Sequence, residues 1–334
     1  MAGRIVERHA FARAGLLGNP SDGYFGRTLS VVLRNFRATV ALEESSEFYI
    51  EPDPLDVDVF HSMQDFVDAV SRQGYYGGAR LVKAAVKTFS DHCSKHGIAL
   101  PARNFTARYQ SSIPRQVGLA GSSAIVTAAL RALMDFYEVS IPIEQQPTLV
   151  LSAEVDELGI TAGLQDRVAQ VYQGLVYMDF SQDLMDGLGH GAYESLDPTL
   201  LPNMFVAHQA SPTKVSGRVL NDLRSRWEQG DPEVLVTLER IAALATKGRD
   251  ALMLGDRAAF SSHMNENFDL RRTIMRISEH DAAMVDAARD LGASAKLTGS
   301  GGAIVGVVEN DDVRQQIAEE LAALGARVIE PQIA

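Results

Sequence analysis

The sequence predicts a globular protein that combines strands and helices. Its 334 residues are 46% hydrophobic and 22% charged, which is the balance of a chain that folds around a core. Short β-branched segments occur within residues 4–50 and again at residues 304–308, as strands require. Helical periodicity dominates residues 215–291. The length is enough for two domains or for one large domain.

The composition excludes several classes of partner. The net charge is −12, from 31 basic and 43 acidic residues, whereas binding to nucleic acid depends on Lys and Arg. No apolar run is long enough to cross a membrane, and the N-terminus carries no signal-like apolar segment. The single cysteine, Cys93, rules out an intrachain disulfide and fits a reducing compartment. We therefore expect a cytoplasmic protein that binds neither nucleic acid nor membranes.

The first 50 residues predict strands interrupted by one polar loop. Residues 29–33 and 38–42 are short β-branched segments, and residues 5–13 alternate loosely. The loop at residues 15–27 is rich in Gly, Asn, Pro and Asp, as turns are. It also places Asp22 and Arg27 beside two aromatic residues, an arrangement that suits a polar, ring-shaped ligand. A connecting turn and a ligand-binding loop explain this segment about equally well.

A helix is expected at residues 79–95, because its apolar residues fall on one face. His92 and His96 near its end have the spacing of a zinc-binding pair. No third ligand is evident, and we prefer the interpretation of a solvated helix end.

The central stretch, residues 113–124, joins a proline, small residues and the start of an apolar helix. Glycines permit positive φ, and the free N–H groups of a helix's first turn attract anions. Ser122 and Ser123 stand where a hydroxyl caps the helix or reaches a phosphate-bound metal. The stretch matches neither a Walker A loop nor a Rossmann fingerprint. By itself it is equally well explained as a capped helix start.

Two acidic residues follow this loop. A helix from Pro147 to about Leu158 carries Glu154 and stops at Gly159. Asp166 comes after a short loop, near a helix N-terminus where its charge is favoured. Taken singly, each is more simply interpreted as an ordinary helix residue, Glu154 on the surface. The glycine cluster at residues 187–191 is interpreted as a turn.

The second half predicts four helices, a second glycine-rich loop and a final helix. The loop at residues 295–303 leads into a strand, and a helix at residues 313–324 and a strand at residues 326–329 follow. Arg271 and Arg272 end the third helix, where they either complement its dipole or bind a carboxylate or phosphate. The four helices are expected at residues 215–227, 232–254, 257–272 and 281–291.

Three loops of the chain resemble, in order and spacing, the three motifs of the GHMP kinases. This superfamily includes galactokinase, homoserine kinase, mevalonate kinase and phosphomevalonate kinase. The loops are residues 18–22, 114–124 and 296–302. Further segments, spread from one end of the chain to the other, resemble the glucuronokinases in particular. They are residues 11–28, 74–78, 113–116, 163–172 and 267–272.

This resemblance implies an α+β fold of two domains. Residues 1–200 would form an N-terminal ATP-binding domain with a mixed sheet, similar to ribosomal protein S5 domain 2. Residues 201–334 would form a ferredoxin-like C-terminal domain, with the active site in the cleft between them. The boundary is placed near residue 200.

The implied activity is phosphorylation of D-glucuronate at its anomeric hydroxyl, with ATP and Mg²⁺, to give glucuronate 1-phosphate and ADP. One alternative is another sugar 1-kinase, acting on galacturonate, arabinose or a heptose, because a few pocket residues change specificity. The other is a catalytically silent regulator that binds sugar and ATP on the same fold.

The resemblance also assigns residue roles. Asp166 would be the catalytic base or would orient the sugar hydroxyl, and Arg13 would stabilise charge on the transferring phosphate. Glu154 and Ser122 would hold Mg²⁺. Counted from Pro114 without a gap, the family's metal-binding serine falls on Gly121, so Ser122 or Ser123 must replace it. The loop residues expected to bind ATP are Pro114, Gly118, Leu119, Ala120, Gly121, Ser122, Ser123 and Ala124.

Sugar contacts are expected from all three motifs. Asn19 and Pro20 replace the Glu-His pair of galactokinase, so the contacts there must differ. A sugar acid also needs a cation facing its carboxylate. The expected substrate-binding residues are Asn19, Asp22, Tyr24, Arg27, Gln165, Arg271, Thr298, Gly299 and Gly301. The candidates for the carboxylate, which the sequence does not rank, are Arg27, Arg115, Arg167, Arg271 and Arg272.

Overall fold

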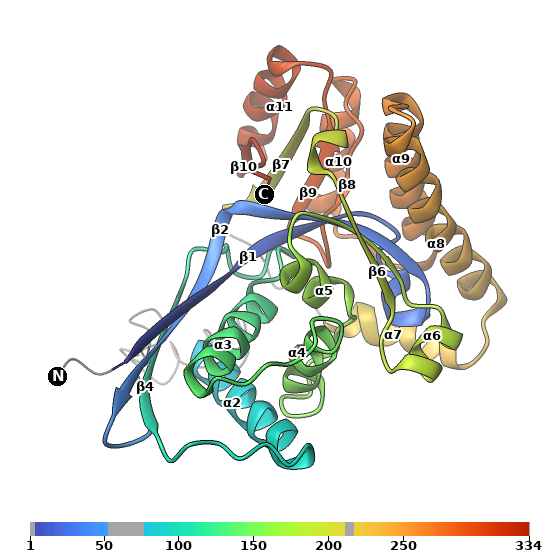
Figure 1. Ribbon diagram of the computed structural model, residues 1–334. Coiled ribbons are helices and arrows are strands. Elements are labelled where there is room, and N and C mark those ends of the chain that lie inside the picture. The colour runs from blue at the N-terminus through green and yellow to red at the C-terminus, as the bar shows by residue number, and fades with distance from the viewer. Residues whose placement is uncertain (1–3, 53–76, 211–216, 334) are drawn as a thin grey trace, which may run out of the picture.

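The computed structural model describes residues 4–52, 77–210 and 217–333. Two sheets and their covering helices form the molecule, and long strands cross its middle (Figure 1). Residues 74–76 of the 74–78 segment, and the expected start of a helix at residue 215, lie outside the described residues.

The larger sheet contains six strands within the described residues, in the order β3-β4-β2-β5-β6, with β1 on the other edge of β2. Every pairing is antiparallel except that of β3 with β4. The strands are β1 (Ile5–Leu17), β2 (Arg27–Ser45), β3 (Tyr49–Ile50), β4 (Asn104–Ser111), β5 (Leu175–Asp179) and β6 (Ala192–Leu196). The 3-10 turn η1 (Ser21–Tyr24) connects β1 to β2.

One strand, β2, replaces the two short strands expected at residues 29–33 and 38–42. The prediction of a break was wrong because the polar segment between them forms a bulge within the strand. Phe11 pairs with Arg37 and the next residue, Ala12, pairs with Leu33, so three residues of β2 have no partner on β1. The bulge lets β2 pair with β4 along one half and with β5 along the other.

Helices cover one face of the larger sheet and bury a core there. Four of the described helices are α2 to α5, which lie beneath the long strands with α3 in a central place (Figure 1). Eleven of the residues of α3 are buried, so this helix is held by packing on several sides. The four are α2 (Gly78–Lys95), α3 (Gly121–Tyr137), α4 (Gln146–Val155) and α5 (Gln165–Tyr172). Beyond them lie α6 (Gln182–Leu188) and the 3-10 turn η3 (Pro198–Leu200).

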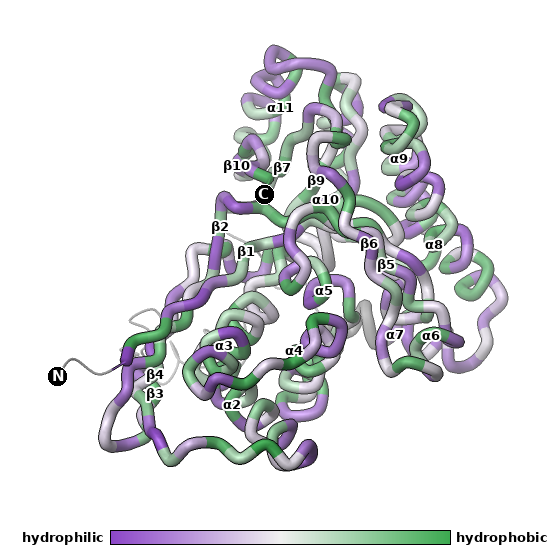
Figure 2. The backbone as a smooth tube through the Cα atoms, in the orientation of Figure 1, coloured by the Kyte–Doolittle hydropathy of each residue, from purple (hydrophilic) through white to green (hydrophobic). Residues whose placement is uncertain are grey.

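The smaller sheet has four strands within the described residues, all antiparallel, in the order β10-β7-β9-β8. In Figure 2, β7 and β9 are largely hydrophobic and α11 is largely hydrophilic, as a buried sheet and its outer helix should be. The strands are β7 (Met204–Gln209), β8 (Lys296–Leu297), β9 (Ala303–Val307) and β10 (Ala326–Ile329). The helices are α7 (Gly217–Glu228), α8 (Pro232–Met253), α9 (Arg257–Ile274), α10 (Glu279–Asp290) and α11 (Asp311–Ala323).

The expected α+β fold is confirmed, although β4, β5, β6 and the two-residue strand β8 were missed. Strands β4, β5 and β6 belong to the larger sheet, and in β4 the buried residues alternate with more exposed ones. The 187–191 turn ends α6 and leads into β6. The larger sheet ends at Leu196 and the smaller begins at Met204. A domain boundary near residue 200 stays a prediction.

Candidate active site

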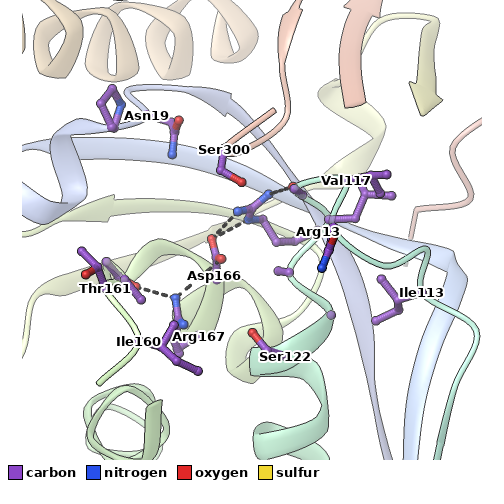
Figure 3. Close-up of a pocket in the computed structure, with 18 of the residues that line it drawn as sticks. Arg13, Asn19, Ile113, Val117, Ser122, Ile160, Thr161, Asp166, Arg167 and Ser300 are labelled. Atoms are coloured by element: carbon purple, nitrogen blue, oxygen red, sulfur yellow. Dashed lines mark hydrogen bonds and ion pairs between the residues drawn. The ribbon is translucent and has the colours of Figure 1, made fainter. Parts of the chain in front are cut away.

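A pocket of about 320 Å³ lies where the three motif loops meet. The central loop and the start of α3 form one wall, and η1 with the segment Ile160–Gly163 forms another. Arg224 of α7, Arg271 of α9 and Ser300 of the last loop complete it. Both halves of the chain therefore contribute to one cavity (Figure 3).

The central loop is shaped by left-handed backbone. Gly118 has φ 67°, and Gln116 and Ala120 adopt φ 60° and 62° although they carry side chains. Ala120 is the N-cap of α3, which begins at Gly121. The first N–H groups of the helix therefore open beside the pocket, where they attract an anion.

The last glycine-rich loop packs directly on the central loop. A Cβ added to Gly299 would lie 2.4 Å from the carbonyl oxygen of Gly118, and one added to Gly118 would lie 2.8 Å from that of Gly301. Only glycine permits backbone to approach backbone this closely. Thr298, Gly299 and Gly301 support the pocket wall from behind, whereas Ser300 lines it.

Ser122 and Ser123 point in different directions. The Ser122 hydroxyl lines the pocket and donates to Glu154 Oε1 at 2.7 Å. Ser123 is completely buried and donates to the carbonyl oxygen of Ala120 at 3.2 Å. Ser123 thus closes the first turn of α3, and Ser122 is the serine that faces the cavity.

Glu154 is a completely buried carboxylate, so its simpler interpretation as a surface residue was wrong. Arg167, also buried, donates from Nε to Glu154 Oε2 at 2.8 Å and from Nη2 to the same oxygen. Burial opposes the charge of Arg167, but the nearby carboxylates of Glu154 and Asp166 outweigh it and raise the pKa of this guanidinium. A buried carboxylate is stable only when paired in this way.

Asp166, in the first turn of α5, forms a second ion pair at the centre of the pocket. Arg13 donates from Nε to Asp166 Oδ1 at 2.6 Å, and its Nη2 lies 2.5 Å from the same oxygen (Figure 3). Arg13 Nη1 also donates to the carbonyl oxygens of Gly118 at 2.8 Å and Thr298 at 2.9 Å. One buried arginine of β1 therefore joins α5 to both glycine-rich loops.

Asp22 of η1 lines the pocket beside Asp166. Its Oδ2 accepts from the backbone N–H of Gln165 at 3.2 Å, and Gly163 is so close that a Cβ there would meet this oxygen. Burial, and then the negative charge of Asp166, raise the pKa of Asp22 to about 6. The side chain of Gln165 turns away from the cavity and accepts from Ser30.

Arg271 reaches the pocket from α9. It is buried, and its Nη1 donates to Asn19 Oδ1 at 2.7 Å and to the carbonyl oxygen of Gly299 at 2.8 Å. Asn267, one turn earlier, receives the N–H of Gly18 and donates to the carbonyl oxygen of Asn19. The segments that resemble glucuronokinases at residues 11–28 and 267–272 thus contact each other.

Two of the arginines expected to bind the carboxylate lie outside the pocket lining, whereas Arg115 of the central loop is part of it. Arg27 is outside the pocket lining and pairs with Asp179 at 2.9 Å. Arg272 is exposed and also outside the lining. The rings of His92 and His96 lie with their centroids 4.2 Å apart and are tilted by 32°. The described part of the chain holds no cluster of three or more His, Cys, Asp or Glu suited to a metal.

Arg224 was missed by the sequence reasoning. Its guanidinium lies 5.1 Å from the ring centre of Tyr24 and 5.7 Å from that of Trp227, and the side chain lines the pocket. In the sequence it is one of several charged residues on an amphipathic helix, and no local pattern distinguishes it. Ser300 could have been found, since it belongs to the last loop.

Two family models match the chain. The model of the GHMP kinases N terminal domain matches residues 80–174, and that of the GHMP kinases C terminal matches residues 249–327. The protein belongs to the GHMP kinase family.

Within the GHMP kinase family, the chain is similar to two glucuronokinases. "Probable glucuronokinase 2" of Arabidopsis thaliana is 46% identical over 334 residues, covering 98% of this chain and 91% of the relative. "Glucuronokinase 1" of the same plant is 44% identical over 332 residues, with the same two coverages.

Solved structures agree with the fold. A galactokinase of Lactococcus lactis, complexed with galactose, aligns with a TM-score of 0.76 at 15% identity, over 99% of this chain and 94% of its own. A Lin0012 protein of Listeria innocua aligns with a TM-score of 0.78 at 14% identity, over 99% and 98%. The expected two-domain GHMP kinase fold is therefore confirmed. Among the described helices, none has the length and apolar composition that a membrane span requires.

Proposed function

We propose that this protein is a sugar-acid kinase that transfers the γ-phosphoryl group of ATP to the anomeric hydroxyl of D-glucuronate. The observation that carries the proposal is the constellation of Asp166, Arg13 and Ser122 around one cavity, in a chain 44–46% identical to two glucuronokinases. An acceptor-orienting carboxylate, a cation and a loop that binds phosphate are what phosphoryl transfer requires. The single buried cysteine, Cys93, supports a cytoplasmic location.

The nucleotide would lie along the central loop. Its phosphates would meet the N-terminus of α3 and the N–H groups of residues 118–122, where the helix dipole favours negative charge. Positioning and charge stabilisation supply most of the catalysis in such reactions.

Mg²⁺ fits the oxygen atoms present beside this loop. Ser122 Oγ and Glu154 Oε1 are 2.7 Å apart, close to the separation of about 2.9 Å between neighbouring ligands of an octahedral Mg²⁺ site. Arg167 binds the other carboxylate oxygen and so leaves Oε1 toward the serine. Ser122 and Glu154 would hold the ion, which in turn would neutralise charge on the phosphate oxygens.

Asp166 would accept a hydrogen bond from the sugar hydroxyl and align it with the γ-phosphorus. In the reaction a bond forms between the anomeric oxygen and the γ-phosphorus. The bond from that phosphorus to the bridging oxygen of ADP breaks. The hydroxyl proton passes to the Asp166 carboxylate, late in a loose transition state. Arg13 would hold Asp166 in place and stabilise the equatorial oxygens of the transferring group.

Asp22 and Asn19 would face the other sugar hydroxyls, because both line the pocket near Asp166. Tyr24 lines the same region and would contact a face of the sugar ring. Gly163 has no side chain, and the Asp22 carboxylate occupies the space that a Cβ there would take. The close contact would hold the Asp22 carboxylate in position.

The proposal is tested by incubating the purified protein with ATP, Mg²⁺ and single sugars, and by following ADP release and the ³¹P spectrum of the product. The panel contains D-glucuronate, galacturonate, glucose, arabinose and a heptose. We expect fastest turnover of D-glucuronate and a phosphate coupled to the anomeric proton. Fastest turnover of another sugar would overturn the substrate assignment, and absence of ADP release with every sugar would overturn the activity.

A further inference from the structure

Arg271 is a buried cation at the pocket wall that forms no ion pair with a described residue, although the carboxylates of Asp281 and Asp22 favour its charge from farther away. Its two hydrogen bonds go to neutral acceptors, Asn19 Oδ1 and the carbonyl oxygen of Gly299. Both come from Nη1, and its Nε is buried with no hydrogen-bond partner. A buried charge with an unsatisfied donor is costly unless an anion compensates it.

The geometry of the remaining donors suits a carboxylate. Nε and Nη2 form the edge of a guanidinium that binds both oxygens of a carboxylate at once. In Arg271 neither atom of this edge donates to a described residue. The other edge is fixed by Asn19 and Gly299, so the free edge is held in one orientation.

Apart from Arg115, which is exposed, the other arginines that line the pocket have different contacts. Arg13 pairs with Asp166, and Arg167 pairs with Glu154. Arg224 is half-buried and stacks over Tyr24 and Trp227. Of these four buried or partly buried cations, Arg271 alone combines burial with neither an ion pair nor a ring contact to another described residue.

Because Asn19 is neutral, it binds Arg271 without neutralising the positive charge of the guanidinium. Position 19 touches Nη1 of Arg271 at 2.7 Å, so an acidic side chain there would form an ion pair with it. With Asn19 in place, the positive field remains available to a ligand. Burial, the largest cause, lowers the pKa of Arg271 to about 10 although the charges of Asp281 and Asp22 oppose the shift, so the guanidinium stays charged at neutral pH.

Resting on the proposed function, we propose that Arg271 is the specificity-determining residue that binds the substrate's carboxylate. In the same proposal, Asn19 is the positioning residue that keeps this arginine oriented without forming an ion pair with it. Sugar acids are then distinguished from neutral sugars by one charge-assisted pair, which contributes about 10- to 100-fold in affinity. The two residues together set the specificity. An acidic side chain at position 19 would form an ion pair with Arg271 and remove the preference for sugar acids.

The test compares kcat/KM for D-glucuronate with that for D-glucose, which differs only in a neutral group at C6. In Arg271→Gln we expect the ratio of the two values to fall about 10- to 100-fold, with KM for ATP unaltered. Asn19→Asp keeps the arginine and should lower the same ratio. A merely structural role would lower turnover of both sugars together and leave the ratio unchanged.

Arg272→Gln changes the neighbouring exposed residue on the same helix and is the matched control. Arg224→Gln tests the other pocket arginine that could bind the carboxylate instead. A selective fall in Arg224→Gln with none in Arg271→Gln overturns the proposal, as does a raised KM for ATP in Arg271→Gln. If Arg271→Gln does not fold, an unchanged ratio in Asn19→Asp overturns it instead. If the unaltered protein phosphorylates neither sugar, the proposed function fails, whereas an active protein with an unchanged ratio in these variants refutes this inference alone.

Discussion

The two ends of the pocket are lined by different kinds of chemical groups. At the central loop, residues 113–122, the walls are mostly small or neutral residues and backbone held in left-handed conformations. At the other end, charged side chains dominate: Asp22, Arg224 and Arg271 line the cavity, with Asp166 and Arg13 between the two ends. Backbone recognises phosphate whatever is attached to it, whereas charged side chains distinguish one acceptor from another.

This difference explains which end can vary. The central loop and the last loop touch backbone to backbone at Gly118 and Gly299, so a side chain there would disrupt the packing. The acceptor end is joined through side chains such as Asn19 and Arg271, which single substitutions can change without moving the chain. We therefore expect changes at the loop to affect all sugars alike, and changes at the acceptor end to affect them selectively.

The largest effect is expected at the junction of the two ends. Asp166→Asn should lower kcat about 10²- to 10⁴-fold, because the variant loses the proton acceptor while the loops keep their shape. ATP binding, measured by calorimetry, should persist. Asp183→Asn, at an exposed position of α6, is the control. Turnover at the level of the unaltered protein in Asp166→Asn would refute the role.

The next effect separates the two serines of the loop end. Ser122→Ala should lower the rate at saturating sugar about tenfold or more and raise the Mg²⁺ concentration needed for half-maximal rate, because its hydroxyl faces Glu154 and the pocket. Ser123→Ala removes a buried hydrogen bond and should instead reduce the free energy of unfolding by about 1 kcal/mol. Mg²⁺ titrations and denaturant unfolding of both variants check this, and the reverse pattern would assign the metal to Ser123.

At the acceptor end, the ionised Asp22 carboxylate should lower the free energy of unfolding at neutral pH. The pKa of Asp22 is about 6 in the folded protein, raised from an ordinary 3.8. Between these values the folded state binds the proton more tightly, so the contribution of Asp22 to stability falls as pH rises from about 4 to 6. Asp22→Asn should therefore be more stable than the unaltered protein above pH 6, by about 1–2 kcal/mol after solvent screening.

The same variant should bind sugar more weakly, since it lacks the charged acceptor. Unfolding at pH 4 and pH 7.5 measures the stability difference, which should be much smaller at the lower pH. An Asp22→Asn protein less stable at pH 7.5 would show that the carboxylate is stabilised, not strained, at the pocket.

The smallest effect concerns the strain of the loop end. Ala120 holds φ 62°, and the left-handed region costs a residue with a Cβ about 1 kcal/mol. Ala120→Gly should raise the free energy of unfolding by up to about 1 kcal/mol, partly offset by the entropy of glycine. Ala283→Gly, inside α10, should lower it by about 1 kcal/mol. Denaturant unfolding compares the two, and equal losses would show that position 120 is not strained.

Much of the fold could be predicted from the sequence, because the motif loops and long helices carry local signals. The bulge in β2 could not, since it depends on which residues of β1 find partners across the sheet. Strand β5 was also missed, although four of its residues are buried; its apolar run is too short to be told from a helix segment by periodicity alone.

The site was predicted where residues sit in motifs and missed where they meet through space. Asp166 and Arg13 were expected in the site, but their direct ion pair joins residues 153 positions apart. Glu154 can be buried because Arg167 pairs with it, and no local sequence pattern reveals that contact. Arg224 reaches the cavity because α7 lies against Tyr24, and its own helix gives no hint of that contact.

A crystal structure with D-glucuronate and a non-hydrolysable ATP analogue tests the central claim most directly. We predict the triphosphate along residues 118–122, the anomeric hydroxyl within hydrogen-bonding distance of the Asp166 carboxylate, and the sugar carboxylate on the free edge of Arg271. A sugar bound with its carboxylate toward the central loop, or with a different hydroxyl at Asp166, would contradict the account.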